Sequence, residues 1–169
     1  MAVTLTRATT DQAPVLQNLI QLYTHDFSEL WAGTSRGELG PDGRFPDYPL
    51  DDYWTRPDWS AWLIWSGDAL AGFALVNDQS HAGATLDRNV AEFFVVRKHR
   101  REGVGAQAAL SLFDQRPGVW ELAVTRANRS GQAFWTKLLQ RSPQVLDLQV
   151  IDMNDARWNG ALLRFNWRS

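Results

Sequence analysis

A glycine-containing basic turn near the middle of the chain has the chemistry of a phosphate-binding site. An apolar run that starts at Val90 passes into four cations and two glycines: Arg97, Lys98, Arg100, Arg101, Gly103 and Gly105. Glycine adopts backbone conformations closed to residues with a Cβ, so successive N–H groups can converge on an anion at a helix N-terminus. The pattern predicts a strand, a phosphate-binding turn and a helix. The alternative is a basic surface turn that binds nothing.

The spacing of these residues narrows the kind of phosphate loop. No Gly-Lys-Ser/Thr follows, which excludes a Walker loop, and Ala108 fills the third glycine position of GxGxxG. The arrangement Arg100-x-x-Gly103-x-Gly105 resembles the pyrophosphate loop of the GCN5-related N-acetyltransferases (GNAT), whose pattern is Gln/Arg-x-x-Gly-x-Gly/Ala.

Hydrophobic periodicity and turn residues predict the elements that would position this turn. A helix begins after a capping-box spacing of Thr9 to Gln12 and keeps an apolar stripe as far as Leu30. Further helices are predicted at 103–115 and 129–140. The predicted strands are 3–8, 59–65, 69–76, 90–96, 119–125, 145–151 and 161–167.

The segment from Trp31 to Pro57 lacks periodicity and reads as a long loop with at most a short helix at 51–55. Its acidic and aromatic residues suit a cationic acceptor, which would bind through cation–π contacts. The alternative is a solvated flap whose aromatic residues only seal the core.

This order of elements resembles that of the GNAT fold over nearly the whole chain. A second motif lies at the last predicted helix, where Asn128, Phe134, Trp135 and Lys137 are similar to Asn-x-x-Ala-x-x-Leu/Phe-Tyr-x-Lys, with Gly131 in the alanine position and Trp135 in the tyrosine position. The segments 22–31, 48–54 and 91–105 also resemble a bacterial branch of predicted acetyltransferases. The resemblance implies an α/β (α+β) fold whose mixed, mostly antiparallel sheet, flanked by helices, splays between the fourth and fifth strands to admit acetyl-CoA.

The resemblance also implies where the co-substrate acetyl-CoA would bind. Phe94, Val95 and Val96 would offer main-chain hydrogen bonds to the pantetheine arm, and Arg100 would support the turn. The amides that face the pyrophosphate would be those of Arg101, Glu102, Gly103, Val104, Gly105 and Ala106. Asn128 would contact the pantetheine or the start of the following helix, and Trp135 would lie beside the cofactor.

Two residues are the candidate catalytic groups for transfer to an amine. Glu92 lies in the strand before the turn, where GNAT enzymes often place a catalytic glutamate, and it is the candidate base. Burial would raise its pKa, and its alternative role is to pair with a buried cation or to hold the loop. The family's usual acid, a tyrosine, is replaced by Trp135, so Tyr53 or Tyr48 would supply the proton, or the thiolate would leave unassisted.

Composition restricts the other classes of function. The chain has 169 residues, a formal net charge of -2 and no cysteine, and we expect a single N-acetyltransferase domain over residues 1–169. The acidic balance argues against nucleic acid, and no apolar stretch or leader pattern suggests a membrane, so a cytoplasmic protein is expected. The three histidines show no metal-ligand spacing, and no metal is expected. Nine tryptophans would fill the core, a ligand cleft or the interface of a homodimer.

Three functions remain open from the sequence. The first is an acetyl-CoA-dependent N-acetyltransferase, an acyltransferase acting on a primary amine of a small molecule or a protein. The second is an acyl-CoA-binding or sensing module without catalysis, suggested by the missing tyrosine. The third is an interaction protein that dimerises through its tryptophans.

Overall fold

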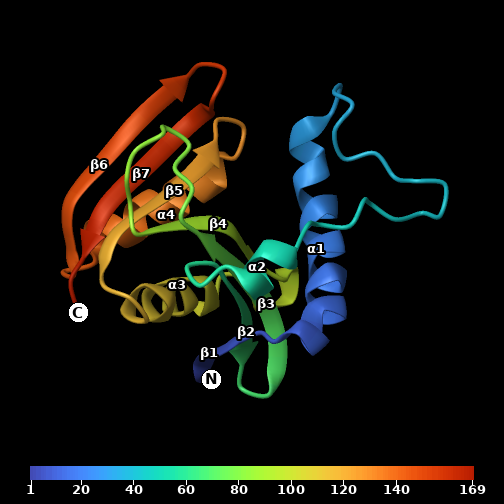
Figure 1. Ribbon diagram of the computed structural model, residues 1–169, viewed down its shortest axis with the longest axis horizontal. Helices are drawn as coiled ribbons and strands as arrows, with labels where there is room; N and C mark the ends of the chain where they lie inside the picture. Colours follow the sequence, from blue (N-terminus) through green and yellow to red (C-terminus); the bar gives the residue numbers. More distant parts are fainter.

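A seven-stranded sheet with helices on both faces organises the computed structural model, which describes residues 1–169 (Figure 1). The strands are β1 (Val3–Arg7), β2 (Ser60–Ser66), β3 (Ala69–Asn77), β4 (Arg88–Val95), β5 (Gly118–Thr125), β6 (Val145–Asn154) and β7 (Asn159–Trp167). The helices are α1 (Ala13–Ser28), α2 (Asp51–Thr55), α3 (Val104–Asp114) and α4 (Arg129–Arg141), with 3-10 turns η1 (Thr10–Gln12), η2 (Glu29–Trp31) and η3 (Arg97–His99). The order of elements predicted from the sequence is confirmed.

The sheet splays between β4 and β5, as the fold resemblance implied. The strand order is β1-β2-β3-β4-β5-β7-β6, and β4–β5 is the one parallel pair. That pairing covers Arg88–Val90 against Trp120–Leu122 only, although β4 continues to Val95 and β5 to Thr125. The two strands therefore part beyond Val90 and leave one edge of β4 without a partner strand.

A β-bulge lies where β4 begins to part from β5. Leu75 pairs with Glu92 while Val76 pairs with Val90, so Ala91 is the extra residue. A bulge bends its strand and shifts the side-chain alternation by one residue. Val90 consequently packs in the core on the α3/α4 face, whereas Glu92 points to the α1 face.

The two faces of the sheet have separate cores. On one face, α1 and α2 pack on β2 and β3 through a cluster that includes Leu16, Ile20, Leu63 and Phe73. On the other face, α3 and α4 cover β5 and β7 through Phe113, Trp120, Trp135, Leu139, Phe165 and Trp167, among others. Four of the nine tryptophans, at positions 59, 120, 135 and 167, are buried, so the core accounts for a large share of them.

Local sequence explains the start of the first helix. The predicted capping box forms between Thr9 and Gln12, with the Thr9 N–H donating to Gln12 Oε1 at 3.1 Å, and Pro14 occupies the first turn of α1. The long segment from Trp31 to Pro57 carries one short helix, α2, at the predicted position. Both predictions are confirmed.

Three strand boundaries differ from the prediction by two or three residues. The last hairpin is longer, because β6 continues to Asn154 and β7 starts at Asn159, whereas the sequence predicted strands at 145–151 and 161–167. These residues lie on an exposed end of the sheet, where polar side chains are compatible with strand pairing. Strand β4 starts at Arg88 rather than Val90, because its first three residues pair with β5. No helix combines the length and the apolar character needed to cross a membrane.

Candidate active site

The turn between β4 and α3 presents a row of free main-chain donors. None of the six N–H groups from Arg101 to Ala106 donates to an acceptor within the protein. Gly103 is the N-cap of α3 with φ of 81°, and Arg101 also has a positive φ of 64°. A left-handed residue followed by a helix start turns successive amides toward one side. The turn therefore has the donors and the helix end that an anion requires.

Arg100 and Asp26 fix this turn to the rest of the fold. Arg100 Nε donates to the main-chain oxygen of Val95 at 2.7 Å, and its Nη2 pairs with Asp26 Oδ2 at 2.5 Å. Arg97 binds the other oxygen of Asp26 at 2.9 Å. Burial opposes ionisation of Asp26, but the two arginines outweigh it and lower the pKa of this carboxyl. Helix α1 thereby anchors the turn by an ionised carboxylate.

Only some of the predicted β4 residues present their main chain to the gap. The N–H of Val96 donates to β3 at 2.8 Å, and the carbonyl oxygen of Phe94 also lies on the β3 side, against Gly72. Main-chain groups of neighbouring strand residues point to opposite sides. The structure therefore turns Val95 toward the gap, together with Phe93, which the sequence analysis did not select, and turns Phe94 and Val96 away from it.

A groove of about 560 Å³ runs between α3 and α4, directly beside the turn. Its walls include two cations, Lys137 and Arg141, in addition to apolar side chains. The lining residues are Ala106, Leu110, Phe134, Lys137, Leu138, Arg141, Ser142, Pro143 and Gln144. A groove of this size that opens next to free amides and carries positive charge suits a phosphate-bearing ligand.

Asn128 and Gly131, at the start of α4, have a structural role that explains why glycine replaces the alanine of the family pattern. The side-chain oxygen of Asn128 caps α4 by accepting the N–H of Gly131 at 2.9 Å. A Cβ on Gly131 would lie 2.5 Å from the Asn128 amide nitrogen, so glycine here leaves room for the cap. Trp135 is buried, with its ring centroid 5.0 Å from that of Phe93 on β4.

Glu92 lies on the opposite face of β4, where two tyrosine hydroxyls donate to it. Tyr23, from α1, donates to Oε2, and Tyr48, from the loop before α2, donates to Oε1 at 3.2 Å. Burial raises the pKa of Glu92, and the two hydroxyls act in the opposite direction by favouring the carboxylate. The carboxylate is thus held with both oxygens bound, beside the point where the strands part.

Two glutamines of α1 bring Tyr48 to this carboxylate. Gln17 binds the main chain of Tyr48 in both directions, with its Nε2 donating to the carbonyl at 2.8 Å and its Oε1 accepting the N–H at 3.1 Å. Gln21, one turn later, binds the main chain of Phe45 in the same way, at 3.0 and 2.9 Å. The loop is therefore pinned along α1, and this ordering places Tyr48 against the carboxylate.

Tyr53 lies in a second row behind Tyr48. It is 4% exposed, its ring centroid is 6.5 Å from that of Tyr48, and it packs on Trp59. Burial, the largest influence, raises its pKa to about 12. Burial and the charge of Glu92 also raise the pKa of Tyr48. All three tyrosines of the chain therefore surround one glutamate, and Tyr23 and Tyr48 are the two that touch it.

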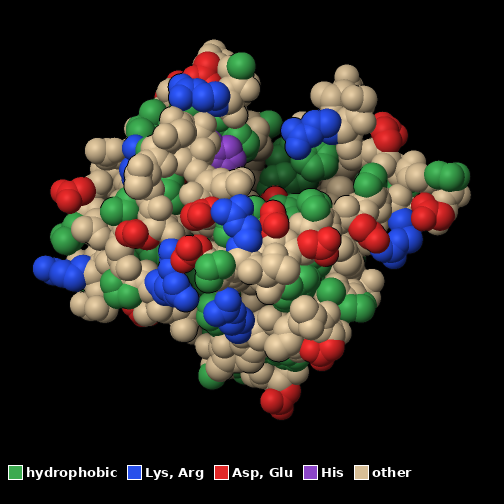
Figure 2. Space-filling view, in the orientation of Figure 1, with side chains coloured by type: hydrophobic (Ala, Val, Ile, Leu, Met, Phe, Trp, Pro, Cys, Tyr) green, Lys and Arg blue, Asp and Glu red, His purple; other side chains and the backbone are tan.

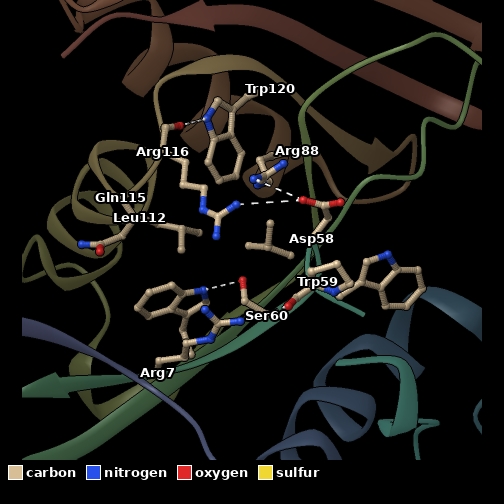
Figure 3. A pocket seen from close by; sticks show the side chains of 12 residues that line it. Arg7, Asp58, Trp59, Ser60, Arg88, Leu112, Gln115, Arg116 and Trp120 are labelled. Carbon is tan, nitrogen blue, oxygen red and sulfur yellow. Dashed lines mark hydrogen bonds and ion pairs between the residues drawn. The ribbon is translucent and has the colours of Figure 1, made fainter. Parts of the chain in front are cut away.

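The other cavity of note is remote from these groups (Figure 3). It holds about 30 Å³ between the ends of β1 and α3 and the amino ends of β4 and β5, and it is lined by Arg7, Asp58, Arg88 and Arg116 among others. That volume accommodates about one water molecule. Because the gap and the turn lie at the carboxyl end of β4, this cavity is not part of the candidate site.

Sequence reasoning missed Tyr23 because its spacing in α1 is that of a core residue. It also missed the main chain of Phe93 and the cation at Arg141.

The groups of three or more His, Cys, Asp or Glu side chains that a metal site needs do not occur. Of the histidines, His81 has a pKa lowered by burial, and its Nδ1 has no hydrogen-bond partner.

Solved structures of acetyltransferases share this fold at low sequence identity. An acetyltransferase from Thermus thermophilus is 17% identical with a TM-score of 0.66, covering 98% of this chain and 96% of that one. The ribosomal-protein-S18-alanine N-acetyltransferase from Escherichia coli is 11% identical with a TM-score of 0.59, covering 98% and 93%. A Bacillus subtilis acetyltransferase in complex with CoA is 12% identical with a TM-score of 0.50, covering 98% and 96%.

Among curated protein sequences, nothing matches the chain. The sequence profile of the acetyltransferase (GNAT) family, in contrast, matches residues 16–139. That range runs from the first turn of α1 nearly to the end of α4 and so contains the splayed strands, the turn and the carboxylate with its tyrosines. The chain therefore belongs to the acetyltransferase (GNAT) family.

Proposed function

We propose that this protein transfers the acetyl group of acetyl-CoA to a primary amine of a small molecule or a protein. The observation that carries the proposal is the row of six free amides from Arg101 to Ala106 beside the gap between β4 and β5. A diphosphate bound there would send the pantetheine arm along the open edge of β4. Coenzyme A in the related Bacillus subtilis structure supports this choice of ligand.

The amine requires a base before it attacks. A primary amine with a pKa near 10.4 is protonated at pH 7, and its deprotonation costs roughly 4.6 kcal/mol at about 1.36 kcal/mol per pKa unit. Glu92 accepts this proton, directly or through the hydroxyl of Tyr23 or Tyr48. Burial raises the pKa of Glu92 and so strengthens it as a base once it is ionised.

The acyl transfer itself uses the main chain of β4. The neutral amine attacks the thioester carbonyl carbon, and the oxyanion that forms accepts a hydrogen bond from an N–H on the open edge, that of Val95 or Phe93. The C–S bond then breaks and the electron pair stays on sulfur. The second ammonium proton goes to the thiolate, which is a tolerable leaving group because thiol pKa values lie near 8.5.

The buried indole of Trp135 favours one alternative function. It occupies the position where related enzymes carry a tyrosine acid, and indole does not supply a proton in that way. A module that binds acyl-CoA without transferring the acyl group would retain the turn and the groove and lack catalysis. Tyr48, with its hydroxyl on Glu92, could replace the missing acid if it reaches the sulfur.

Two measurements test the proposal in sequence. Calorimetry with acetyl-CoA, CoA and desulfo-CoA determines whether the coenzyme binds, and release of the CoA thiol in the presence of an amine panel determines whether the acetyl group is transferred. Binding with thiol release supports the transferase, and binding without thiol release for any amine supports the non-catalytic module. Failure to bind any of the three coenzymes contradicts both.

A further inference from the structure

Three aromatic side chains form a stripe along one side of α1 and η2. Tyr23, Phe27 and Trp31 are spaced four residues apart, and their ring centroids are separated by 4.5 Å and then 6.1 Å. Residues at this spacing follow one another on the same helix face, so the stripe extends for roughly 12 Å along the helix axis at about 1.5 Å per residue. Its inner end is Tyr23, which binds Glu92.

A single cation stands at the outer end of the stripe. Arg36, the one Lys or Arg between Arg7 and Arg44, places its guanidinium carbon 4.5 Å from the centroid of the Trp31 ring. The guanidinium forms no ion pair or hydrogen bond within the protein. Its positive charge nevertheless reaches inward: burial raises the pKa of Glu92 and of Tyr23, and the charge of Arg36 opposes that rise in both.

The chain after η2 is built to hold this arginine in place. Gly37, with φ of 72°, lies so close to α1 that a Cβ on it would be 2.8 Å from the Trp31 ring and 3.1 Å from Ser28 Cβ. The loop therefore folds back over the end of the helix directly after Arg36. A guanidinium stacked on an aromatic ring is preorganised and still offers its N–H groups to a planar anion.

A hollow in the molecular surface lies beside the C-terminal end of α1, the helix that carries Tyr23 and Phe27 (Figure 2). Figure 2 shows the molecule hollowed between the end of the β6–β7 hairpin and the C-terminal end of α1, with hydrophobic side chains on its floor and basic side-chain atoms over the end of α1. The β4–β5 gap opens toward this side of the sheet, because Glu92 and Tyr23 meet on the α1 face. An acceptor that reaches the gap from this hollow would pass along the aromatic stripe.

We infer that the acceptor is a zwitterionic amine: its amine lies at Glu92, its apolar body lies along Tyr23, Phe27 and Trp31, and a carboxylate at its far end pairs with Arg36. The inference rests on the proposed transferase function and specifies its substrate class. The two charged groups of the acceptor are then separated by about the length of the stripe, roughly 12 Å. Charge complementarity excludes a diamine from the best substrates, because its second ammonium would face Arg36.

A matched pair of acceptors tests the inference. The ratio of kcat/KM for ω-aminooctanoate to that for ω-aminooctanol is measured in the wild type, in Arg36→Met and in the control Arg44→Met. Arg44 belongs to the same loop and forms an exposed ion pair with Asp47 at 3.1 Å, away from the stripe. We expect a ratio above about 10 in the wild type and in Arg44→Met, and a ratio near unity in Arg36→Met through a higher KM for the carboxylate, since an arginine–carboxylate pair is charge-assisted.

The outcomes separate this inference from the transferase proposal. Three results overturn the zwitterionic acceptor and leave the transferase proposal intact. They are a wild-type ratio near or below unity, an unchanged ratio in Arg36→Met, and a higher kcat/KM for 1,8-diaminooctane than for ω-aminooctanoate. If neither acceptor releases thiol, ligand-observed NMR with the CoA-loaded protein decides the matter. The subsite is supported if the protein binds ω-aminooctanoate and if Arg36→Met weakens this binding while Arg44→Met does not. Equal binding of both acceptors, or binding of neither, overturns it.

Discussion

Replacement of Glu92 by Gln removes one proton acceptor and keeps the shape of the side chain. The carboxylate receives the hydroxyls of Tyr23 and Tyr48 and lies on β4 just beyond the residues that pair with β5. If Glu92 takes the amine proton, it offsets part of the roughly 4.6 kcal/mol that deprotonation of the amine costs at pH 7, and the variant loses that contribution. We expect kcat to fall by about 10²–10⁴-fold, the usual contribution of a positioned general base.

The pH profile gives an independent check on the same residue. The base acts when ionised, so the activity should rise with pH through the pKa of Glu92, which burial places above the ordinary glutamate value of 4.5. In Glu92→Gln this acidic limb should disappear. If the acidic limb persists in the variant, another group is responsible for it.

The stability of the variant distinguishes a catalytic defect from unfolding. A carboxyl whose pKa is raised in the folded state binds its proton more tightly there, so its contribution to stability is largest below the unfolded pKa and is lost as the pH rises through the folded pKa. The wild type loses this contribution as the pH rises through the raised pKa of Glu92, whereas the side chain of Glu92→Gln does not titrate. Above that pKa, Glu92→Gln should therefore melt at the same temperature as the wild type or higher.

Rates of thiol release at saturating acetyl-CoA, with Asp68→Asn as the control, complete the experiment. Asp68 is an exposed residue in the turn between β2 and β3 and should behave as the wild type. Tyr48→Phe should lower kcat more than Tyr53→Phe, because Tyr48 touches the carboxylate and Tyr53 lies behind it. A Glu92→Gln enzyme with wild-type kcat and an unchanged pH profile would refute the assignment of Glu92 as the base.

Three further perturbations test the turn and the scaffold. Gly103→Val forces a β-branched residue into φ of 81°, which should cost about 1–2 kcal/mol of stability and weaken acetyl-CoA binding at least about tenfold in calorimetry. The control Gly83→Val, at φ of 71° in a distant loop, should cost a similar amount of stability and leave the affinity for acetyl-CoA unchanged. Arg164→Met leaves the fully buried Glu121 without its 2.8 Å partner and should cost about 3–5 kcal/mol in denaturant unfolding, and a loss below about 1 kcal/mol would contradict a buried pair. Asp26 has a lowered pKa, so its contribution is present above pH 3.8 and lost below it; the difference in stability between wild type and Asp26→Asn should shrink as the pH falls through that range, and a pH-independent difference would count against the ion pairs.

Much of the fold followed from local sequence. Capping residues at Thr9, glycines at the β4–α3 turn and apolar periodicity predicted the order of the elements, because each of these signals acts over a few neighbouring residues. The row of free amides at residues 101–106 is likewise a local feature. A turn and the helix that follows it create a row of free amides without help from distant parts of the chain.

The candidate site at Glu92 needed the tertiary structure. Tyr23 and Glu92 are 69 residues apart, and Tyr23 lies in a helical stripe that periodicity assigns to the core. Tyr48 reaches the carboxylate only because Gln17 pins the loop to α1. Nothing in the sequence near Tyr48 or Tyr53 distinguishes which one makes the contact, since the choice depends on where a long loop crosses a helix.

The register of β4 determined which of its side chains face the candidate site. A single extra residue at Ala91 sets which side chains of β4 face α1 and falls at the point where β4 begins to part from β5. A strand has a period of two, so a shift by one residue exchanges its faces and leaves the composition of the strand unchanged. The sequence by itself thus determined the elements and the turn with its free amides, whereas the position of the carboxylate and its tyrosine partners came from long-range packing.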